Sequence, residues 1–522
     1  MKLAKLKSGQ LVETKGYYVA GDAGAGRYLV APSQIADEYG SHTLTNGVVA
    51  VLQHNGVVNV KQFGARGNIS NDDRLPIQSA INSLTPFGGV VNFPVGIYGV
   101  SEGGVGTCLS IEYPVKLKGD GAPYTAIRPF DSVPATTNTI VISPNVGYTG
   151  DFMLIEGLYL GNPYNGQRAG GTGLNLVTTT NLQSLPKFTL RDTFIAGGVT
   201  GHGIVHTNAN NVEGGAYGIV IENCTIKDGI KLDDSGDSIQ IYRCILSGDN
   251  IGVEASQIAG ASLLSIIDCN ITNNGGAIKV NRALRTHIMR NNIENIGVGA
   301  TAQNDGAVVN ISGTNGTGTA GVISQNLVSA FQDTDASILV RIREARGMVV
   351  ENNTLLCGIN GGADAIDVAL SQDVRVGTNT FNAGTVVDAI DKKISRVVDS
   401  GTGTTGVRKT LTLLNSWVEY STSETPKAFK DSNGIVHLEG TIKSGTTTYG
   451  TPLFMLPPGY APTRGTLIRV GTYSLGGLHE GSARLEIDEA GSVTIAGGGN
   501  VMLTLTGITF SADEFSNSYV LE

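Results

Sequence analysis

The sequence predicts a mostly β chain in which short parallel strands stack in successive coils, followed by a separate antiparallel β domain. Three observations favour this fold. Of the 522 residues 72 are Gly, while only 6% are aromatic and 16% charged, which suits short strands and tight turns better than layers of helices. A strand–helix–strand unit opens the central part of the chain. An apolar motif then repeats along that part.

Residues 1–56 are expected to form a small neck before the coils. They contain the Gly-rich stretch GYYVAGDAGAGRYLV at 16–30, then a polar segment and VVAVLQHNG. The amino terminus lacks the apolar core of a secretion signal, so we expect the chain to be made in the cytoplasm. No apolar run is long enough to span a bilayer, so we expect no membrane insertion.

The segment 57–101 predicts a strand, a helix and a second strand in one short unit. Residues 58–63 are the expected first strand, which ends in a Gly turn. Asp72 or Asp73 can accept the first free N–H groups of a capping helix over about 72–85. The apolar face of that helix, at i, i+3, i+4 and i+7, consists of Ile77, Ala80, Ile81 and Leu84.

Beyond this unit, a short apolar strand with Cys or Asn at one fixed position recurs, as in IENCTI, IYRCIL and IIDCNI. The steps between these positions fit coils with loops of varying length. We interpret the column as a ladder in which amides hydrogen-bond from rung to rung and thiols fill space. All five cysteines are expected to be reduced. The ladder comprises Cys224, Cys244, Cys269, Asn291, Asn326, Asn353 and Asn379.

The coils are expected to fill residues 57–399, and residues 400–522 to form the separate domain. A low-complexity hinge, SGTGTTG, opens this last region. Its later runs alternate apolar and polar residues between Gly, Asn and Asp turns, which predicts an antiparallel β-sandwich. The sandwich contains the single tryptophan, Trp417.

Charge and motif content exclude several classes of function. The formal net charge is −9 and no basic run occurs, so we expect no nucleic-acid partner. The cysteines have no paired spacing of the C-x-x-C kind, and neither a nucleophile elbow nor a phosphate loop is present. The sequence therefore predicts no metal site, no cofactor, and neither esterase nor nucleotide chemistry.

The opening unit resembles the start of the pectate-lyase-like right-handed β-helix superfamily. Asn68-Ile69 departs from the family's usual Asp-Gly, and Pro76 from its usual Ala, but both touch only the turn and the helix start. The motif specifies a fold and carries no catalytic residue. The matching positions are Phe63-Gly64-Ala65, Asp72-Asp73, Ile77-Gln78, Ala80-Ile81, Gly88-Gly89, Phe93-Pro94, Gly96 and Tyr98.

The two end regions resemble modules of bacteriophage tailspikes. This resemblance implies a homotrimer in the phage virion that binds capsular or lipopolysaccharide glycan and joins a tail or baseplate protein through its N-terminus. It also implies assembly in the host cytoplasm and action at the bacterial surface. The last region is then a trimerisation or carbohydrate-binding sandwich. The residues concerned are Gly16-Tyr17-Tyr18, Gly21-Asp22, Gly24 and Gly26-Arg27-Tyr28, and later Leu414-Asn415-Ser416-Trp417, Gly434 to Leu438, Gly440, Leu456 to Tyr460 and Pro462.

Residues that act on a glycan must point outward from the coils. When the strands of successive coils are aligned with Ile230, Ile251 and Ile278 facing inward, alternate residues are expected to point outward. It predicts that Asp233 and Glu254 lie one above the other, because neighbouring rungs stack at about 4.8 Å. The expected substrate-binding residues around this pair are Lys231, Lys279, Asn281, Arg341 and Tyr242.

Two carboxyl groups on one face suit glycoside hydrolysis. One acid protonates the leaving oxygen, and the other acts as nucleophile at roughly 5–5.5 Å separation or as base at roughly 6.5–9.5 Å. Like charges that close also raise one pKa, as a general acid requires. Asp234 and Asp237 in the next turn leave open which acid pairs with Glu254. The alternative interpretation of the column is a solvated salt-bridge ladder.

The sequence therefore predicts an endo-acting glycoside hydrolase that depolymerises capsule or O-antigen. One alternative is a polysaccharide lyase acting by β-elimination, in which His202 or His206 abstracts a proton beside a uronate carboxylate. Another is a non-catalytic receptor-binding fibre that uses the same face only to hold sugar.

Overall fold

The structure of the protein is a computed structural model. It describes residues 5–32, 34–104, 106–144, 153–161, 171–178, 185–197, 201–208, 216–233, 238–256, 263–273, 275–281, 285–295, 304–313, 319–330, 338–356, 366–369, 371, 374–377, 379–381, 397–399, 408–430, 435–462, 464–473, 479–497 and 499–512. Within these ranges no helix has the length and apolar character needed to cross a membrane.

The first elements form an antiparallel sheet in the order β1-β2-β4-β3. Its strands are β1 (Leu11–Glu13), β2 (Arg27–Ala31), β3 (Ser41–Thr43) and β4 (Val49–Leu52). Asp22 fixes the turn between β1 and β2 by accepting four backbone N–H groups, from Tyr17, Tyr18, Val19 and Gly24. Burial opposes ionisation of this carboxyl, but the four donors outweigh it and lower the pKa of Asp22 to about 2.

The opening of the coils contains β5 (Val57–Asn59), the 3-10 helix η1 (Val60–Phe63) and α1 (Arg74–Asn82). The expected first strand stops at Asn59, because the Asn59 side chain accepts the Lys61 N–H and starts η1. Helix α1 is shorter than the expected 72–85. Asp72 accepts the Arg74 N–H at 3.1 Å, whereas Asp73 accepts the N–H groups of the preceding turn.

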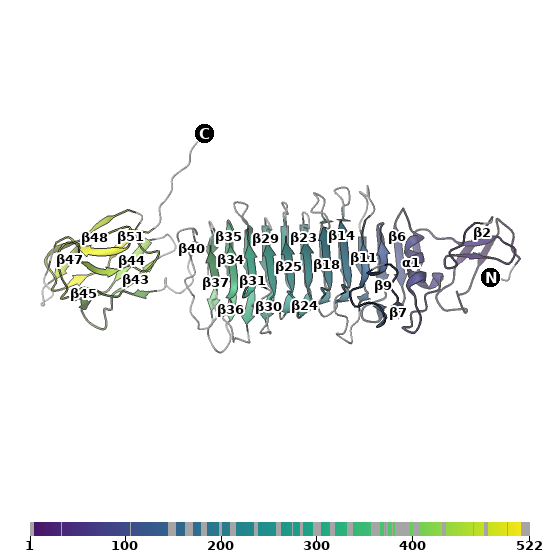
Figure 1. Ribbon diagram of the computed structural model, residues 1–522, viewed down its shortest axis with the longest axis horizontal. Helices are drawn as coiled ribbons and strands as arrows, with labels where there is room; N and C mark the ends of the chain where they lie inside the picture. The colour runs from purple at the N-terminus through teal and green to yellow at the C-terminus, as the bar shows by residue number, and fades with distance from the viewer. Residues whose placement is uncertain are drawn as a thin grey trace, which may run out of the picture. The chain divides into compact units, whose positions relative to one another are not determined.

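Three long parallel sheets follow, and their strands stack one coil upon the next (Figure 1). We name them B, C and D. Sheet B contains β5, β6 (Gly89–Phe93), β9 (Val115–Gly119), β12 (Met153–Glu156), β16 (Phe188–Arg191), β20 (Ile219–Glu222), β23 (Ser238–Tyr242), β26 (Leu263–Ile267), β29 (Arg285–Met289), β32 (Ala320–Ser324), β35 (Met348–Glu351), β38 (Val374–Val376) and β40 (Val397–Asp399).

Sheet C contains β7 (Gly96–Val100), β10 (Thr125–Pro129), β13 (Tyr159–Leu160), β17 (Phe194–Ala196), β21 (Thr225–Lys227), β24 (Ile245–Gly248), β27 (Asn270–Asn273), β30 (Asn292–Asn295), β33 (Leu327–Ala330), β36 (Thr354–Leu356) and β39 (Thr380–Phe381). Sheet D contains β8 (Thr107–Ile111), β11 (Asn138–Ile142), β14 (Leu174–Thr178), β18 (Ile204–Asn208), β22 (Ile230–Asp233), β25 (Val253–Ser256), β28 (Ile278–Asn281), β31 (Ala307–Ser312), β34 (Ile338–Arg343) and β37 (Ile366–Ala369). The short strands β15 (Leu185–Pro186) and β19 (Ala216–Tyr217) pair with each other. The predicted parallel β-helix is confirmed.

The Cys/Asn ladder lies at the corner between sheets B and C. Asn291 donates its backbone N–H and its Nδ2 to Asn326 Oδ1 at 2.9 and 3.0 Å, and Asn326 bonds Asn353 in the same way. These amides are at most 2% exposed, so each coil is joined to the next inside the core. Cys224, Cys244 and Cys269 continue the column as buried free thiols, whereas Cys357 falls outside the described residues.

The C-terminal region forms two antiparallel sheets, as the alternating pattern predicts. One contains β41 (Lys409–Thr410), β43 (Lys427–Lys430), β44 (Ile435–Glu439) and β51 (Ile508–Ser511). The other contains β42 (Val418–Glu419), β45 (Thr441–Lys443), β46 (Pro452–Met455), β47 (Thr466–Tyr473), β48 (His479–Ile487), β49 (Ser492–Ile495) and β50 (Leu503–Thr504). Trp417 is 3% exposed in the core of this region and donates its Nε1–H to the Thr446 carbonyl at 3.2 Å.

Candidate functional site

A column of polar side chains runs along the outer face of sheet D. In β22 the side chains of Ile230 and Leu232 are buried in the core, so Lys231 between them points outward. Parallel pairing aligns Lys231 with Glu254 of β25 and Glu254 with Lys279 of β28. The same column continues through Asn310 of β31 to Arg341 of β34. We call these five residues, Lys231, Glu254, Lys279, Asn310 and Arg341, the sheet D column.

Side chains from the turns join this column. His202, just before β18, places its Nε2 4.0 Å from Glu254 Oε2, and both side chains are about one-fifth exposed. Asp305, just before β31, lies 3.7 Å from Lys279 Nζ through its Oδ2 and accepts a hydrogen bond from Asn310 Nδ2 at 3.0 Å. Carboxylates therefore lie on both sides of Lys279, one on the strand before it and one from the turn after it.

Asp367 of β37 ends the polar region. Arg341 Nε donates to its Oδ2 at 3.1 Å, and Arg343 Nη2 donates to the same oxygen at 3.2 Å. The Asp367 side chain is only 4% exposed, so two guanidinium groups compensate a buried carboxylate. This arrangement fixes the position of Arg341. It does not favour Asp367 as a group that transfers a proton.

The predicted stacking of Asp233 on Glu254 is wrong. The alignment set Ile251 beside Ile230, but the structure pairs Ile230 with Val253, two residues later. Residues 251–252 precede β25 and belong to the corner that leads into it. Glu254 therefore lies between Lys231 and Lys279, which brings the predicted basic residues closer to it than the sequence alignment did.

The Cα of Asp233 pairs with that of Ser256, two residues along the strand from the pair Lys231 and Glu254. Asn281 follows Ser256 on the next rung, donates to Ser256 Oγ at 3.4 Å and accepts from the Ser312 hydroxyl. The side chain of Asp233 and all of Asp234 and Asp237 lie outside the described residues.

Two further predictions are corrected. Tyr242 lies on the outer side of sheet B at the end of β23, so it does not share a face with Glu254. His206 points into the interior of the β-helix, where it is 0% exposed and its Nε2 lies 3.5 Å from Thr178 Oγ1. A glycan on the surface cannot reach His206, which leaves His202 as the histidine near Glu254.

A salt-bridge ladder of the kind considered for Glu254 also occurs on sheet B. Glu156 contacts Lys118 Nζ at 2.6 Å and also bonds the Arg191 guanidinium, and Arg191 in turn contacts Glu222 at 3.7 Å. Burial opposes ionisation, but these two cations lower the pKa of Glu156. Such acids stay ionised and serve to join rungs.

Sequence reasoning missed two acids near this face. Asp305 lay in a turn with no repeat to mark it. Asp228, at the corner before β22, is 4% exposed, and burial raises its pKa to about 6 against the opposing charge of Lys227. Its carboxyl lies close against Gly248 of the neighbouring coil, so it faces the corner. No sequence pattern signals either placement.

Comparison with known proteins finds a family model that matches part of the coils. Residues 57–301 match the family model described as rhamnogalacturonase A/epimerase, pectate lyase-like. Mannuronan C5-epimerase AlgE6 of Azotobacter vinelandii is 37% identical over 110 residues, which are 20% of this chain and 13% of the epimerase. Mannuronan C5-epimerase AlgE1 of the same organism is 44% identical over 79 residues, 14% of this chain and 6% of that protein. The chain thus spans a small part of the curated relatives that it matches.

Similar solved structures include phage tailspikes. The tailspike of Acinetobacter phage vB_ApiP_P1 has a TM-score of 0.48 and 13% identity, covering 98% of this chain and 96% of that one. The enzymatically active domain of bacteriophage CBA120 tailspike protein 2 has a TM-score of 0.44 and 14% identity, with 97% and 78% coverage. Tailspike gp49 of Acinetobacter baumannii bacteriophage Fri1, a capsular polysaccharide depolymerase, has a TM-score of 0.36 and 13% identity, with 98% coverage of both chains.

The family match covers the capping helix and the coils that carry Lys231, Glu254 and Lys279. It agrees with the resemblance of the opening motif and with the three parallel sheets. Residues 57–301 of this chain are therefore similar to the rhamnogalacturonase A/epimerase, pectate lyase-like family.

Proposed function

We propose that this chain is an endo-acting glycoside hydrolase that depolymerises capsule or O-antigen on the outer face of sheet D, as part of a phage tailspike. The observation that carries the proposal is the place of Glu254 between Lys231 and Lys279 in one outward column, with His202 at 4.0 Å. The cations can hold an anionic glycan across several rungs, while Glu254 supplies the carboxyl that acid–base chemistry needs.

Asp233 is the proposed second carboxylate, on the ground of its Cα position. Its Cα is one rung from that of Glu254 and two residues further along the strand. With a rung spacing of about 4.8 Å and about 3.3 Å per residue, the two Cα atoms are ~8 Å apart. If the carboxyl groups keep that spacing, they fall in the roughly 6.5–9.5 Å range of inverting glycosidases. Asp234, Asp237 and Asp305 are the other candidates for this role.

One observation favours β-elimination as a second candidate reaction. His202 Nε2 lies 4.0 Å from Glu254 Oε2, within ion-pair distance, and Lys231 and Lys279 flank Glu254. In a lyase, neutral His202 would take the proton beside a uronate carboxylate, and the lysines would stabilise the charge that develops on that carboxylate. The glycosidic C4–O bond would then break as a C4=C5 double bond forms, and water would protonate the leaving oxygen. The same face therefore serves both reactions, and the product distinguishes them.

The test is incubation of the protein with capsule purified from candidate hosts. We expect new reducing ends without absorbance from unsaturated uronate, and products whose first anomer is inverted in a time-resolved NMR spectrum. Reducing ends together with unsaturated uronate would replace hydrolysis by elimination. Binding of the capsule without new chain ends would instead leave a non-catalytic attachment protein.

We also propose that the protein works as a homotrimer whose N-terminal part joins a phage tail or baseplate protein. In one outward column of sheet C, Ile97, Ile245 and Leu327 are 42%, 50% and 39% exposed among polar residues such as Asn270 and Asn292, and copies packed lengthwise would cover these apolar side chains. Apolar surface of this kind is covered in stable assemblies.

The C-terminal sandwich is the proposed clamp of that trimer. Sedimentation of the full chain should give three copies per particle, and a chain ending at Ser400 should dissociate at lower concentration of denaturant. A truncated chain that forms equally stable trimers would show that the clamp lies elsewhere.

A further inference from the structure

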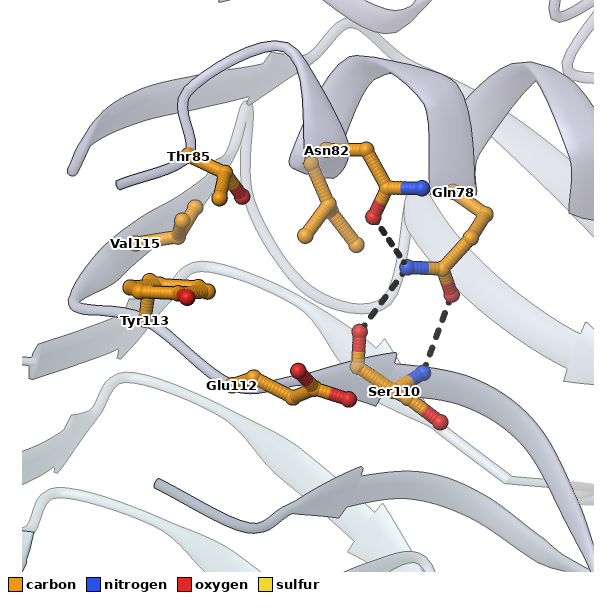
Figure 2. A pocket seen from close by; sticks show the side chains of 8 residues that line it. Gln78, Asn82, Thr85, Ser110, Glu112, Tyr113 and Val115 are labelled. Atoms are coloured by element: carbon orange, nitrogen blue, oxygen red, sulfur yellow. Dashed lines mark hydrogen bonds between the residues drawn. The ribbon is translucent and has the colours of Figure 1, made fainter. Parts of the chain in front are cut away.

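A polar cleft of about 390 Å³ lies between α1 and the corner that joins β8 to β9 (Figure 2). Helix α1 contributes Asn82, and Thr85 follows it at the rim. The other wall carries Ser110, Glu112 and Tyr113. Asn82, Thr85 and Glu112 are exposed, and Tyr113 and Ser110 are partly buried. The cleft therefore offers amide, hydroxyl and carboxylate groups beside one aromatic ring.

Gln78 gives this cleft a fixed geometry. Its Nε2 donates to the Ser110 carbonyl at 2.9 Å, and its Oε1 accepts the Ser110 N–H at 3.0 Å, so the side chain completes the edge of β8 as another strand would. The same Nε2 donates to Asn82 Oδ1 at 2.9 Å (Figure 2). This bond holds the Asn82 amide by its oxygen and leaves its NH2 end as the donor.

These groups match a sugar ring better than other small ligands. A pyranose has hydroxyls that both donate and accept hydrogen bonds, and an apolar C–H face that packs on an aromatic ring. Asn82 can donate, Glu112 can accept, Thr85 can do both, and Tyr113 supplies the ring. The Glu112 carboxylate disfavours an anionic ligand, so the class indicated is a neutral sugar.

The cleft lies on the same outward column as Glu254. Ser110 lies between the buried Leu109 and Ile111, so its side chain points outward from β8. Parallel pairing aligns it in turn with Val141, Asn175, Val205, Lys231 and Glu254. Five steps of about 4.8 Å place the cleft ~24 Å from Glu254 along the β-helix axis.

A polar group also lies on the path between the two sites. Asn175, two rungs from Ser110, pairs in register with Val141 on one side and Val205 on the other, so its polar side chain belongs to the column that joins the cleft to Glu254.

We propose that the cleft at α1 is a distal subsite, which binds a neutral sugar of the same glycan chain that Glu254 cleaves. This inference rests on the proposed function, because it takes sheet D as the glycan face. The subsite makes affinity depend on chain length: an oligosaccharide of several units can occupy both places, whereas a disaccharide at Glu254 cannot reach the cleft.

The test measures binding separately from cleavage. In the full-length chain carrying Glu254→Gln, Thr85→Trp blocks the cleft and Glu112→Ala removes an acceptor. Leu75→Ala is the matched control, since Leu75 is an exposed α1 residue that does not line the cleft. The probe is the capsular polysaccharide that the parent chain binds, cut by mild acid and separated into disaccharides and long fragments. Affinities are measured by titration calorimetry.

We expect both cleft variants to bind long fragments about tenfold more weakly, the effect of losing one or two hydrogen bonds, while Leu75→Ala binds as the parent does. Disaccharide affinity should not change. Equal affinity of all variants for long fragments, or an equal loss for disaccharides, would overturn the distal subsite. If the parent binds the polysaccharide without cutting it, the proposed hydrolase activity fails, but the length-dependent loss still tests the cleft.

Discussion

Replacing Glu254 by Gln is expected to lower turnover of the host polysaccharide by at least the ~10²–10⁴-fold that general acid–base groups contribute. The amide keeps the size and shape of the side chain but can neither give nor hold the transferred proton. Glu254 lies between Lys231 and Lys279 on an outward face, so the change leaves the buried residues of β25 in place. The measurement is kcat on purified capsule, with circular dichroism and glycan binding as checks on the fold.

Glu294→Gln is the matched control for this prediction. Glu294 is a partly buried carboxylate on the outer side of sheet C, away from the sheet D column, and its replacement should leave kcat unchanged. Asp233→Asn, measured in the same assay, tests whether Asp233 is the second carboxylate. A Glu254→Gln variant that cuts at the parent rate would mean that Glu254 is only part of a surface ion-pair network, which contributes ~0–1 kcal/mol to stability and nothing to chemistry.

Replacing Asn326 by Ala is expected to cost on the order of 3 kcal/mol or more of unfolding free energy. The Asn326 side chain accepts from the N–H and Nδ2 of Asn291, and it donates to the Ile288 carbonyl and to Asn353 Oδ1. All of these contacts lie in the core, where a buried group left without its partner costs about 1–3 kcal/mol. Guanidinium unfolding followed by circular dichroism measures the change.

Asn292→Ala is the control for the ladder, since Asn292 is exposed and bonds Asn270 on the outer side of sheet C at 3.1 Å. Its replacement should change the unfolding free energy by less than ~1 kcal/mol. Asn326→Cys should be milder than Asn326→Ala, because a thiol at the equivalent position, Cys269, receives the backbone N–H of Cys244 at 3.5 Å. If Asn326→Ala has the same unfolding free energy as the parent, the amide hydrogen bonds between coils do not stabilise the fold.

The coils and their ladder could be predicted from the sequence because each depends on local chemistry. From β20 to β35, the residue after each sheet B strand has a positive φ, as Arg290 and Gln325 have, and the next residue turns its side chain into the core. A small side chain or a self-pairing amide fits there, so Cys and Asn recur at one position in these coils. The capping helix was likewise marked by its apolar spacing, although hydrogen bonds to Asn59 and Asp72 decided where strand and helix begin and end.

The composition of the candidate site was set by the tertiary structure. A one-residue shift in pairing register turns every side chain of a strand to the opposite face, and a two-residue shift keeps the face but changes which residues are neighbours. Because the loops between coils vary in length, the register could not be predicted from the sequence. The corner before β25 takes up Ile251, which moved Glu254 from beside Asp233 to a place between two lysines. His206 occupies an inward-facing position of β18, so its side chain points into the core. Asp305 contacts the sheet D column from the turn before β31.

The sequence by itself therefore determined the parallel coils, their internal amide ladder and the outward charge of Lys231, Glu254 and Lys279. The hydrophobic period and the turn residues depend on only a few neighbouring positions, so both can be read directly from the sequence. Which of these charges meet was decided only when the coils stacked, because contact across a parallel sheet joins residues 20 or more positions apart whose pairing depends on how each corner is built.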